Sequence, residues 1–538
     1  MPRFQDKPSP QQSRWGLVVA LYAAGGFAAC APKVSDTPPK VAPQFDTVPA
    51  AVDAPWRVEA SERRTQDLPT QSRPVLLKNA RLLLGDGREI PSGHIAFANG
   101  RITSVGTGPG TPEANATVID AGGKFVTPGL IDTHSHIGVY PLPHVNAHSD
   151  GNEATSPVTP DVRTIDAVWP QDPAIARAIA GGVTTIQVLP GSANLVGGRA
   201  VTLKLRRAVS ARDMVFEAAP GGLKMACGEN PKRVYGGRKS APSTRMGNLA
   251  GQRSAFLAAR RLIDEWDQFR KEDQKERSED AKERAIEKAE QEQRKLREAW
   301  CSKVRSHTSQ KRCAAWRRTW SEASDETSEP KSPKLPPARD LAKETLAAAL
   351  EGRILVHVHC YRADDMARIL ALGDEVGFSV RSFHHALEAY KIRKELARRK
   401  IAVSTWADWW GFKVEAYDGI PENIALLSQA QAMPVVHSDS VEGIQRLNQE
   451  AAKALWAGRH AGIPIDTGKA IEWVTKNPAW ALGIDARVGT LAKGKDADVV
   501  LWSADPLSVY STAERVYIDG VLRFERGAAP DSDFEVSQ

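Results

Sequence analysis

Two histidines separated by one residue are the strongest chemical signal in the sequence. The segment TPGLIDTHSH reads as an apolar strand that ends at His134 and His136. Side chains two residues apart on a strand point to the same side, so these two imidazoles can bind one ion together. Neutral imidazole is a natural ligand for zinc and for similar transition metals. The motif therefore predicts part of a metal site at the end of a strand.

The same segment resembles the first-strand signature PGLID-x-HxH of the amidohydrolase superfamily. The resemblance extends over most of the chain, from about residue 75 to about residue 525. It implies a metal-dependent hydrolase built on a barrel of alternating strands and helices. It also implies further ligands: a histidine on the fifth strand, a histidine on the sixth and an aspartate on the eighth.

All three of these implied ligands have candidates in the expected order. In ILVHVHCYRADDM the resemblance to imidazolonepropionase-like members selects His359, and His357 lies on the same face behind it. His384 and His385 are adjacent and so point to opposite sides of a strand. The resemblance selects His385 as the ligand and leaves His384 a structural role. Asp439, in VVHSDS, is the expected aspartate.

The fourth-strand ligand has three candidates. Members with two metal ions use a lysine that carbon dioxide has carboxylated, and Lys224 in GLKMACGEN stands at about the right place. Lys204 and Glu229 are the alternatives. The resemblance implies one or two zinc ions as the cofactor, with Mn²⁺ or Fe²⁺ as alternatives.

The implied chemistry is the hydrolysis of a carbon–nitrogen bond. A bound metal lowers the pKa of its water to about 7, and the resulting hydroxide attacks an amide carbonyl. Asp439 then serves first as the base and next as the acid that protonates the leaving nitrogen.

The substrate is less well defined than the chemistry. Superfamily deaminases carry an acidic residue shortly after the fifth-strand histidine, whereas Cys360, Tyr361 and Arg362 follow here. We therefore expect a small-molecule amide, a dipeptide or a cyclic amide, with Arg362 and Arg233 as candidates for binding a substrate carboxylate. The alternatives are a deaminase of the same superfamily and a catalytically inactive, surface-binding lipoprotein.

The elements that must position these residues alternate between strands and helices. Apolar runs such as GVTTIQVLP and RILVHVHC alternate with amphipathic stretches, which predicts a (β/α)₈ TIM barrel over residues 128–486. Short strands separated by turn signals precede and follow it. They predict a small β-sandwich domain built from both chain ends, residues 73–127 and 487–530.

A charged segment interrupts the barrel pattern. Residues 250–340 form a predicted helical insertion, because Glu, Lys and Arg are dense up to Trp300 and a Ser/Pro-rich stretch follows. A solvated helical hairpin with i,i+4 charge pairs is the interpretation we favour. A lid over the barrel mouth is the alternative.

The first residues resemble an export signal. Basic residues precede an apolar run at 15–29, and Phe27-Ala28-Ala29-Cys30 resembles the lipobox of bacterial lipoproteins. We expect residues 1–30 to be a lipoprotein signal peptide, with Cys30 as the acylated anchor. Residues 31–72, rich in Pro, Thr and Ser, then form a disordered tether. The predicted location is the periplasm or outer membrane of a Gram-negative bacterium.

Composition excludes some classes of partner. The net charge is +7, but acidic and basic residues are interleaved and no nucleic-acid motif occurs, so we expect no nucleic-acid binding. No CxxC pair exists, which argues against a thiolate zinc site. Cys301 and Cys313 can pair in an oxidising compartment. The sequence does not decide the oligomeric state, and a homo-oligomer is one alternative.

Overall fold

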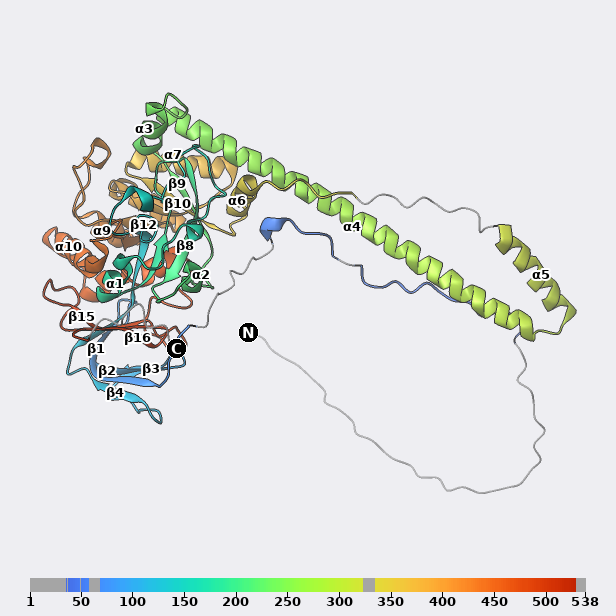
Figure 1. The fold of residues 1–538 in the computed structure, drawn as a ribbon, viewed down its shortest axis with the longest axis horizontal. Coiled ribbons are helices and arrows are strands. Elements are labelled where there is room, and N and C mark those ends of the chain that lie inside the picture. The colour runs from blue at the N-terminus through green and yellow to red at the C-terminus, as the bar shows by residue number, and fades with distance from the viewer. Residues whose placement is uncertain (1–34, 36, 49, 58–67, 323–333, 529–538) are drawn as a thin grey trace, which may run out of the picture. The chain divides into compact units, whose positions relative to one another are not determined.

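The computed structural model describes residues 35, 37–48, 50–57, 68–322 and 334–528 (Figure 1). The predicted signal peptide and Cys30 lie outside these residues. Within them, no helix is both long and apolar enough to span a membrane. The chain divides into two compact units. One is formed by residues 1–50 and 274–334, and the other by residues 51–273 and 335–538.

The larger unit contains an eight-stranded barrel sheet, which confirms the predicted α/β barrel. Its strands follow one another in chain order around the sheet. They are β6 (Leu130–Ser135), β7 (Val183–Val188), β8 (Val196–Lys204), β9 (Gly222–Ala226), β10 (Leu355–Cys360), β11 (Val380–His385), β12 (Ala402–Thr405) and β13 (Met433–Val436).

One strand departs from the expected all-parallel order. β8 pairs antiparallel with both β7 and β9, whereas the other neighbouring strands pair in parallel. Only residues 189–195 connect β7 to β8. A parallel crossover needs a dozen or more residues, so this short connection permits only a hairpin.

The sequence accounts for these elements locally. Every residue of β7, VTTIQV, is buried, as expected of a β-branched strand covered on both faces. The helix α7 (Ala363–Val376) has two acidic residues in its first turn. It ends at Gly377, whose left-handed φ of 96° lets its N–H bond the carbonyl of Gly373.

Helices cover the outside of the barrel (Figure 1). Besides α7 and the start of the insertion, the helices of the larger unit are α1 (Pro173–Ala180), α2 (Ala211–Met214), α3 (Glu229–Gly237), α6 (Leu341–Leu350), α8 (Arg393–Arg399), α9 (Asn423–Gln429), α10 (Leu447–His460), α11 (Thr467–Glu472) and α12 (Lys476–Ala481).

Both chain ends meet in a second eight-stranded sheet, as the sequence predicted. Figure 1 shows strands from the start of the chain beside strands from its end. They are β1 (Val75–Leu83), β2 (Glu89–Ala98), β3 (Arg101–Thr107), β4 (Thr117–Asp120), β5 (Phe125–Pro128), β14 (Val499–Trp502), β15 (Ala513–Ile518) and β16 (Val521–Glu525). The antiparallel pairing of β5 with β14 joins the two ends. Their buried residues, among them Phe97 and Tyr517, share one apolar cluster.

A buried lysine connects this sheet to the barrel. Lys204 ends β8 with its side chain only 1% exposed. Its Nζ lies 2.7 Å from Asp496 Oδ2 and 3.2 Å from Asp498 Oδ1, and it also bonds Asp519. An isolated buried charge is costly, so the ammonium and the carboxylates depend on one another, and removal of one would leave the others uncompensated.

The predicted helical insertion lies between β9 and β10. It contains α4 (Arg245–Lys303), a helix of 59 residues, and α5 (His307–Glu322). Ion pairs four residues apart, such as Lys275–Glu279 and Arg294–Glu298, occur along α4. This agrees with the predicted solvated helix, although the first helix is longer than a compact hairpin requires.

The segment expected to be a disordered tether has contacts in its described part. The carbonyl of Ser35 accepts a hydrogen bond from Trp300 Nε1, and Val41 N–H donates to Gln293 Oε1. Further along the chain, Ala54 packs with apolar residues of α4. The composition did not indicate these contacts, because they depend on α4 as a neighbour.

We predict that Lys204→Met destabilises the larger unit. Removing one partner from a buried charge set costs about 3–5 kcal/mol. Burial raises the pKa of Asp498 to about 6. Without the ammonium the carboxylates repel one another, and this repulsion disappears as they are protonated. The loss of stability should therefore be larger at about pH 8 than at about pH 5. Thermal unfolding at both pH values tests this. The exposed Lys493→Met serves as the control, and equal melting temperatures for the two variants would contradict the prediction.

Candidate metal centre

The predicted HxH pair meets the predicted aspartate at the end of β6. His134 Nε2 lies 3.6 Å from Asp439 Oδ1, and His136 Nε2 lies 3.3 Å from the same oxygen. His134 is buried and His136 is partly exposed. Ligand atoms of all three residues lie within 4.8 Å of one another, which is close enough to bind one metal ion.

A second donor group shares His134 with the first. His134, His385 and His437 are all buried, and their ligand atoms also lie within 4.8 Å of one another. His385 Nδ1 lies 3.9 Å from Asp439 Oδ2, so the aspartate of the first group also approaches the second. The sequence reasoning assigned no role to His437. The signal that could have found it is its position two residues before Asp439, in HSD.

His359 lies beside these groups rather than within either. Its ring centroid is 4.5 Å from that of His385, and the two rings meet edge to face. Neither of its ring nitrogens has a hydrogen-bond partner among the described residues. The predicted fifth-strand ligand is therefore a buried, unpaired imidazole next to the centre.

Lys224 is the fourth-strand candidate that lies near the histidines. It is buried on β9 opposite His357 of β10, and its Nζ donates to the carbonyl of Pro190 at 3.0 Å. Burial lowers its pKa to about 8, while the negative charge of Asp439 acts in the opposite direction. The alternatives lie elsewhere, since Lys204 belongs to the aspartate cluster and Glu229 lies 3.4 Å from Lys413 Nζ.

Burial keeps the imidazoles neutral. It lowers the pKa of His437 to about 3 and the pKa values of His134, His359 and His385 well below the usual value. A neutral imidazole keeps a lone pair for a metal. Buried nitrogens of His359, His385 and His437 lack partners in the described part of the chain. Unpaired buried polar atoms are costly, and a metal bound here would satisfy them. The donor set of imidazoles and one carboxylate thus fits zinc or a similar ion.

A chain of hydrogen bonds orients His134 from behind. His134 Nδ1 lies 2.9 Å from His384 Nδ1, and His384 Nε2 lies 3.0 Å from His357 Nδ1. His357 Nε2 in turn lies 3.3 Å from Gln187 Nε2. The expectation that His384 and His385 point to opposite sides does not describe this pair, because both ring centroids lie close to that of His134, at 4.9 and 4.7 Å, and His385 has a left-handed φ of 68° rather than an extended backbone. His384 contacts Nδ1 of His134, whereas Nε2 of His134 faces Asp439.

Asp132 holds the first and last barrel strands together at the site. Its carboxylate accepts hydrogen bonds from the Ser438 N–H at 3.2 Å, from the Ser438 hydroxyl and from the His134 N–H at 3.0 Å. The Asp439 N–H donates to the carbonyl of His134 at 3.0 Å. Burial raises the pKa of Asp132 to about 6, against the effect of these hydrogen bonds. These contacts fix Asp439 beside the HxH pair.

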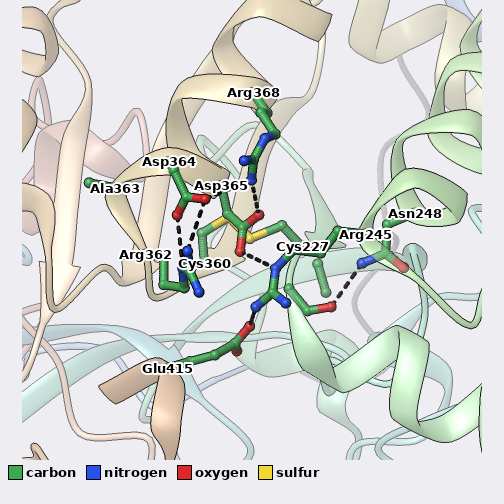
Figure 2. The surroundings of a disulfide bond; sticks show 12 residues. Cys227, Arg245, Asn248, Cys360, Arg362, Ala363, Asp364, Asp365, Arg368 and Glu415 are labelled. Atoms are coloured by element: carbon green, nitrogen blue, oxygen red, sulfur yellow. Dashed lines mark hydrogen bonds and ion pairs between the residues drawn. A yellow bond between two sulfur atoms is a disulfide. The ribbon is translucent and has the colours of Figure 1, made fainter. Parts of the chain in front are cut away.

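A disulfide that the sequence did not indicate joins the ends of β9 and β10. Cys227 and Cys360 are bonded, and Cys227 N–H also donates to the carbonyl of His359 at 2.9 Å. Figure 2 shows Arg245 beside this bond, between Asp365 and Glu415. The second disulfide, Cys301–Cys313, is the pair that the sequence analysis named.

The two arginines predicted to bind substrate are placed away from the metal ligands. Arg362 donates to both carboxylate oxygens of Asp364, as Figure 2 shows, and Arg233 is exposed on α3. The cation nearer the centre is Lys413, whose Nζ lies 3.8 Å from the centroid of the Tyr361 ring. Its charge contributes to the low pKa of His359. Sequence reasoning missed Lys413 because it lies on the long connection after β12.

Aromatic side chains form one wall of the site. Trp406 stacks on His385 with ring centroids 4.5 Å apart, and Trp409 stacks on Trp406 at 5.0 Å. A pocket of about 840 Å³ begins at these two tryptophans and at Ser438 and Ser440, the serines that flank Asp439. Most of its lining comes from residues 442–459 and 505–509, and none of the candidate metal ligands lines it, so it adjoins the centre rather than enclosing it. This volume is in the range of small-molecule binding pockets.

Comparisons with known proteins agree with this geometry. A sequence model of the amidohydrolase family matches residues 338–524. A solved structure of an amidohydrolase from Thermotoga maritima is 33% identical, with a TM-score of 0.65. The match covers 84% of this chain and all of that one.

Two curated relatives are longer than the part of them that this chain matches. The amidohydrolase tasK of Hapsidospora irregularis is 33% identical over 485 residues, which are 84% of this chain and 43% of tasK. A 5-methylthioadenosine/S-adenosylhomocysteine deaminase of Halalkalibacterium halodurans is 35% identical over 100 residues, 18% of this chain and 21% of the deaminase. The chain therefore spans less than half the length of these two relatives.

We predict that His384→Leu weakens metal binding although His384 is not in either donor group. The substitution removes the hydrogen bond that orients His134, and loss of such a partner typically lowers metal affinity about 10–100-fold. Zinc titration against a competing chelator measures the effect. The control is His94→Leu, which also removes a histidine with two hydrogen bonds, in the β-domain. Equal zinc affinities in the two variants would contradict the assigned role.

Proposed function

This chain belongs to the amidohydrolase family, and we propose that it is a metal-dependent hydrolase of carbon–nitrogen bonds in small substrates. The observation that carries the proposal is the pair of donor groups that share His134, in which Asp439 of one group also approaches His385 of the other. They lie at the carboxyl ends of the barrel strands, where barrel enzymes have their active sites.

The residues that would hold metal are His134, His136, His385, His437 and Asp439. His359 and Lys224 lie next to them and would complete the set, with Lys224 as a bridge between two ions if it is carboxylated. When bound, zinc would polarise a substrate carbonyl and lower the pKa of a water molecule to about 7.

Asp439 is the proposed proton carrier. Its side chain is 23% exposed, whereas the neighbouring imidazoles of His134 and His385 are almost completely buried. The side chain of His136 is 18% exposed, so these two are the groups of the two donor sets that substrate and solvent can reach, and Asp439 is the carboxylate of the pair. Its carboxylate would accept the proton of the attacking water and deliver it to the leaving nitrogen.

The surroundings of His359 support hydrolysis of an amide rather than deamination. Cys360 is held in a disulfide, Tyr361 stacks on His385, and Arg362 turns to Asp364. No carboxylate from these three positions is available as the acidic group that superfamily deaminases use there. The pocket beside Trp406 is large enough for a dipeptide or a cyclic amide.

Deamination is a second candidate, favoured by the match to the deaminase of Halalkalibacterium halodurans. The two functions differ in their products. A deaminase releases ammonia from an amino-substituted ring, whereas an amide hydrolase forms a new carboxylate.

A substrate screen tests the proposed function. Dipeptides, N-acyl amino acids, cyclic amides and aminopurine nucleosides would be offered to zinc-loaded, manganese-loaded and chelator-treated protein. We expect metal-dependent cleavage of an amide. Ammonia release from the nucleosides alone would favour the deaminase. Metal-free protein with the activity of the loaded enzyme would refute metal dependence.

We predict that Asp439→Asn keeps most of its metal and loses turnover. Asparagine preserves the size of the side chain and one oxygen, but an amide does not accept a proton at neutral pH. Loss of a positioned acid/base group costs about 10²–10⁴-fold in kcat, and KM should change far less. Steady-state kinetics and metal analysis of the same sample measure both effects. Turnover within a few-fold of wild type would show that another group moves the proton.

We predict that Lys224→Ala lowers the metal content from about two ions per chain towards one. The alanine removes the amine that carbon dioxide would carboxylate. Short-chain carboxylic acids should partly restore the second ion, and Lys224→Glu, which carries its own carboxylate, should retain more metal than the alanine variant. Elemental analysis gives the stoichiometry. If Lys224→Ala binds as much metal as wild type, the bridging ligand is a different residue.

A further inference from the structure

A disulfide cross-links the two helices of the charged insertion where α4 ends and α5 begins. The disulfide Cys301–Cys313 joins the last turns of α4 to α5, with Cα atoms 5.8 Å apart. The guanidinium of Arg297 lies 5.8 Å from the centroid of the Trp316 ring, so α5 contacts α4 beyond the disulfide as well. We call residues 299–318 the insertion tip.

The insertion tip is strongly basic. Between Glu298 and Glu322 the sequence contains six lysines and arginines and no aspartate or glutamate. All six are exposed. They are Lys303, Arg305, Lys311, Arg312, Arg317 and Arg318. The stretch of α4 from Asp264 to Glu298 differs, because acidic and basic residues are interleaved there and form ion pairs such as Lys275–Glu279.

The N-terminal segment approaches the insertion tip. Ser35 contacts Trp300 through a hydrogen bond of 2.8 Å, and Val41 contacts Gln293 through one of 2.7 Å. The contacts thus move away from the tip as the chain proceeds from Ser35 to Val41. Cys30, the predicted acylation site, lies outside the described residues and precedes Ser35 by five residues in the sequence.

We propose that the insertion tip is a docking surface for the anionic phospholipid headgroups of a membrane. Six clustered positive charges are complementary to such a surface, and each lysine or arginine near it strengthens binding roughly fivefold. Trp316, beside the disulfide, is of the residue type that concentrates at membrane interfaces.

The tip would act together with the lipid anchor that we expect at Cys30. A basic cluster is a common companion of a lipid anchor at membranes. The tip and the anchor would then be two attachments of the protein to the membrane. This proposal concerns attachment and is independent of the hydrolytic chemistry.

Vesicle binding of the full-length Cys30→Ala protein tests the proposal without the lipid. The test variant is Lys311→Gln/Arg312→Gln/Arg317→Gln. The matched control is Lys275→Gln/Lys282→Gln/Lys288→Gln, which removes the same charge from the middle of α4. Sedimentation with vesicles of equal parts phosphatidylglycerol and phosphatidylcholine gives the partition coefficient. Any contribution of the apolar leader is common to all three proteins.

We expect the tip variant to bind these vesicles roughly 100-fold more weakly than its parent. The control variant should lose much less of the parent's affinity. Binding of the parent should also weaken at high salt, because the attraction is electrostatic. Circular dichroism would verify that both variants are folded. Equal losses in the tip and control variants would overturn the proposal. So would equal binding of the parent to pure phosphatidylcholine vesicles, which would mean that charge does not guide attachment.

Discussion

The hydrogen bonds between Asp132 and Ser438 connect the two ends of the barrel sheet, beside the HxH pair at one end and Asp439 at the other. β6 and β13 are the first and last strands of the barrel sheet, and no ladder of hydrogen bonds pairs them among the described residues. Lower in the barrel, Ile131 N–H and Val436 N–H instead donate to the carbonyls of Val474 and Trp473. Near the site, the Asp132 carboxylate accepts the hydrogen bond of the Ser438 N–H, which in a paired strand would go to a backbone carbonyl. The distances between Asp439 and the HxH pair depend on this connection.

The same centre concentrates polar groups in a buried space, which is costly unless each is satisfied. The protein satisfies some of them internally. His134, His384, His357 and Gln187 form one hydrogen-bonded chain, and Lys224 donates to a carbonyl. Other nitrogens, on His359 and His437, are left without partners in the described structure. The hydrogen-bonded side chains therefore support the site, and the imidazoles without partners are the ones available to bind a cation.

Two disulfides stabilise different parts of the chain. Cys227–Cys360 joins β9 and β10, the strands that carry Lys224 and His359, and so restrains two groups of the centre relative to one another. Cys301–Cys313 closes the end of the insertion, far along the sequence from every candidate ligand. Both are compatible with the oxidising compartment that the predicted export signal implies. The far end of the insertion therefore has its own local stabilisation, whereas its beginning packs on the barrel, where Phe256 joins the barrel core and Gln252 donates to the carbonyl of Ala226.

The sequence by itself determined the barrel, the domain built from both chain ends and the order of the main candidate ligands. Strand periodicity placed His134 and His136 on one side of β6, because alternation is a local property of the backbone. Only the tertiary structure decided which of several equivalent residues reach the centre. Lys204 and Lys224 both lie on apolar strands, yet one meets three aspartates and the other meets the histidines. His437, the pairing of Cys227 with Cys360 and the turn of Arg362 towards Asp364 were likewise missed. These contacts join residues distant in sequence or depend on side-chain direction in a loop. The local sequence pattern carries no information about such neighbours, because only the packing of strands and helices brings them together.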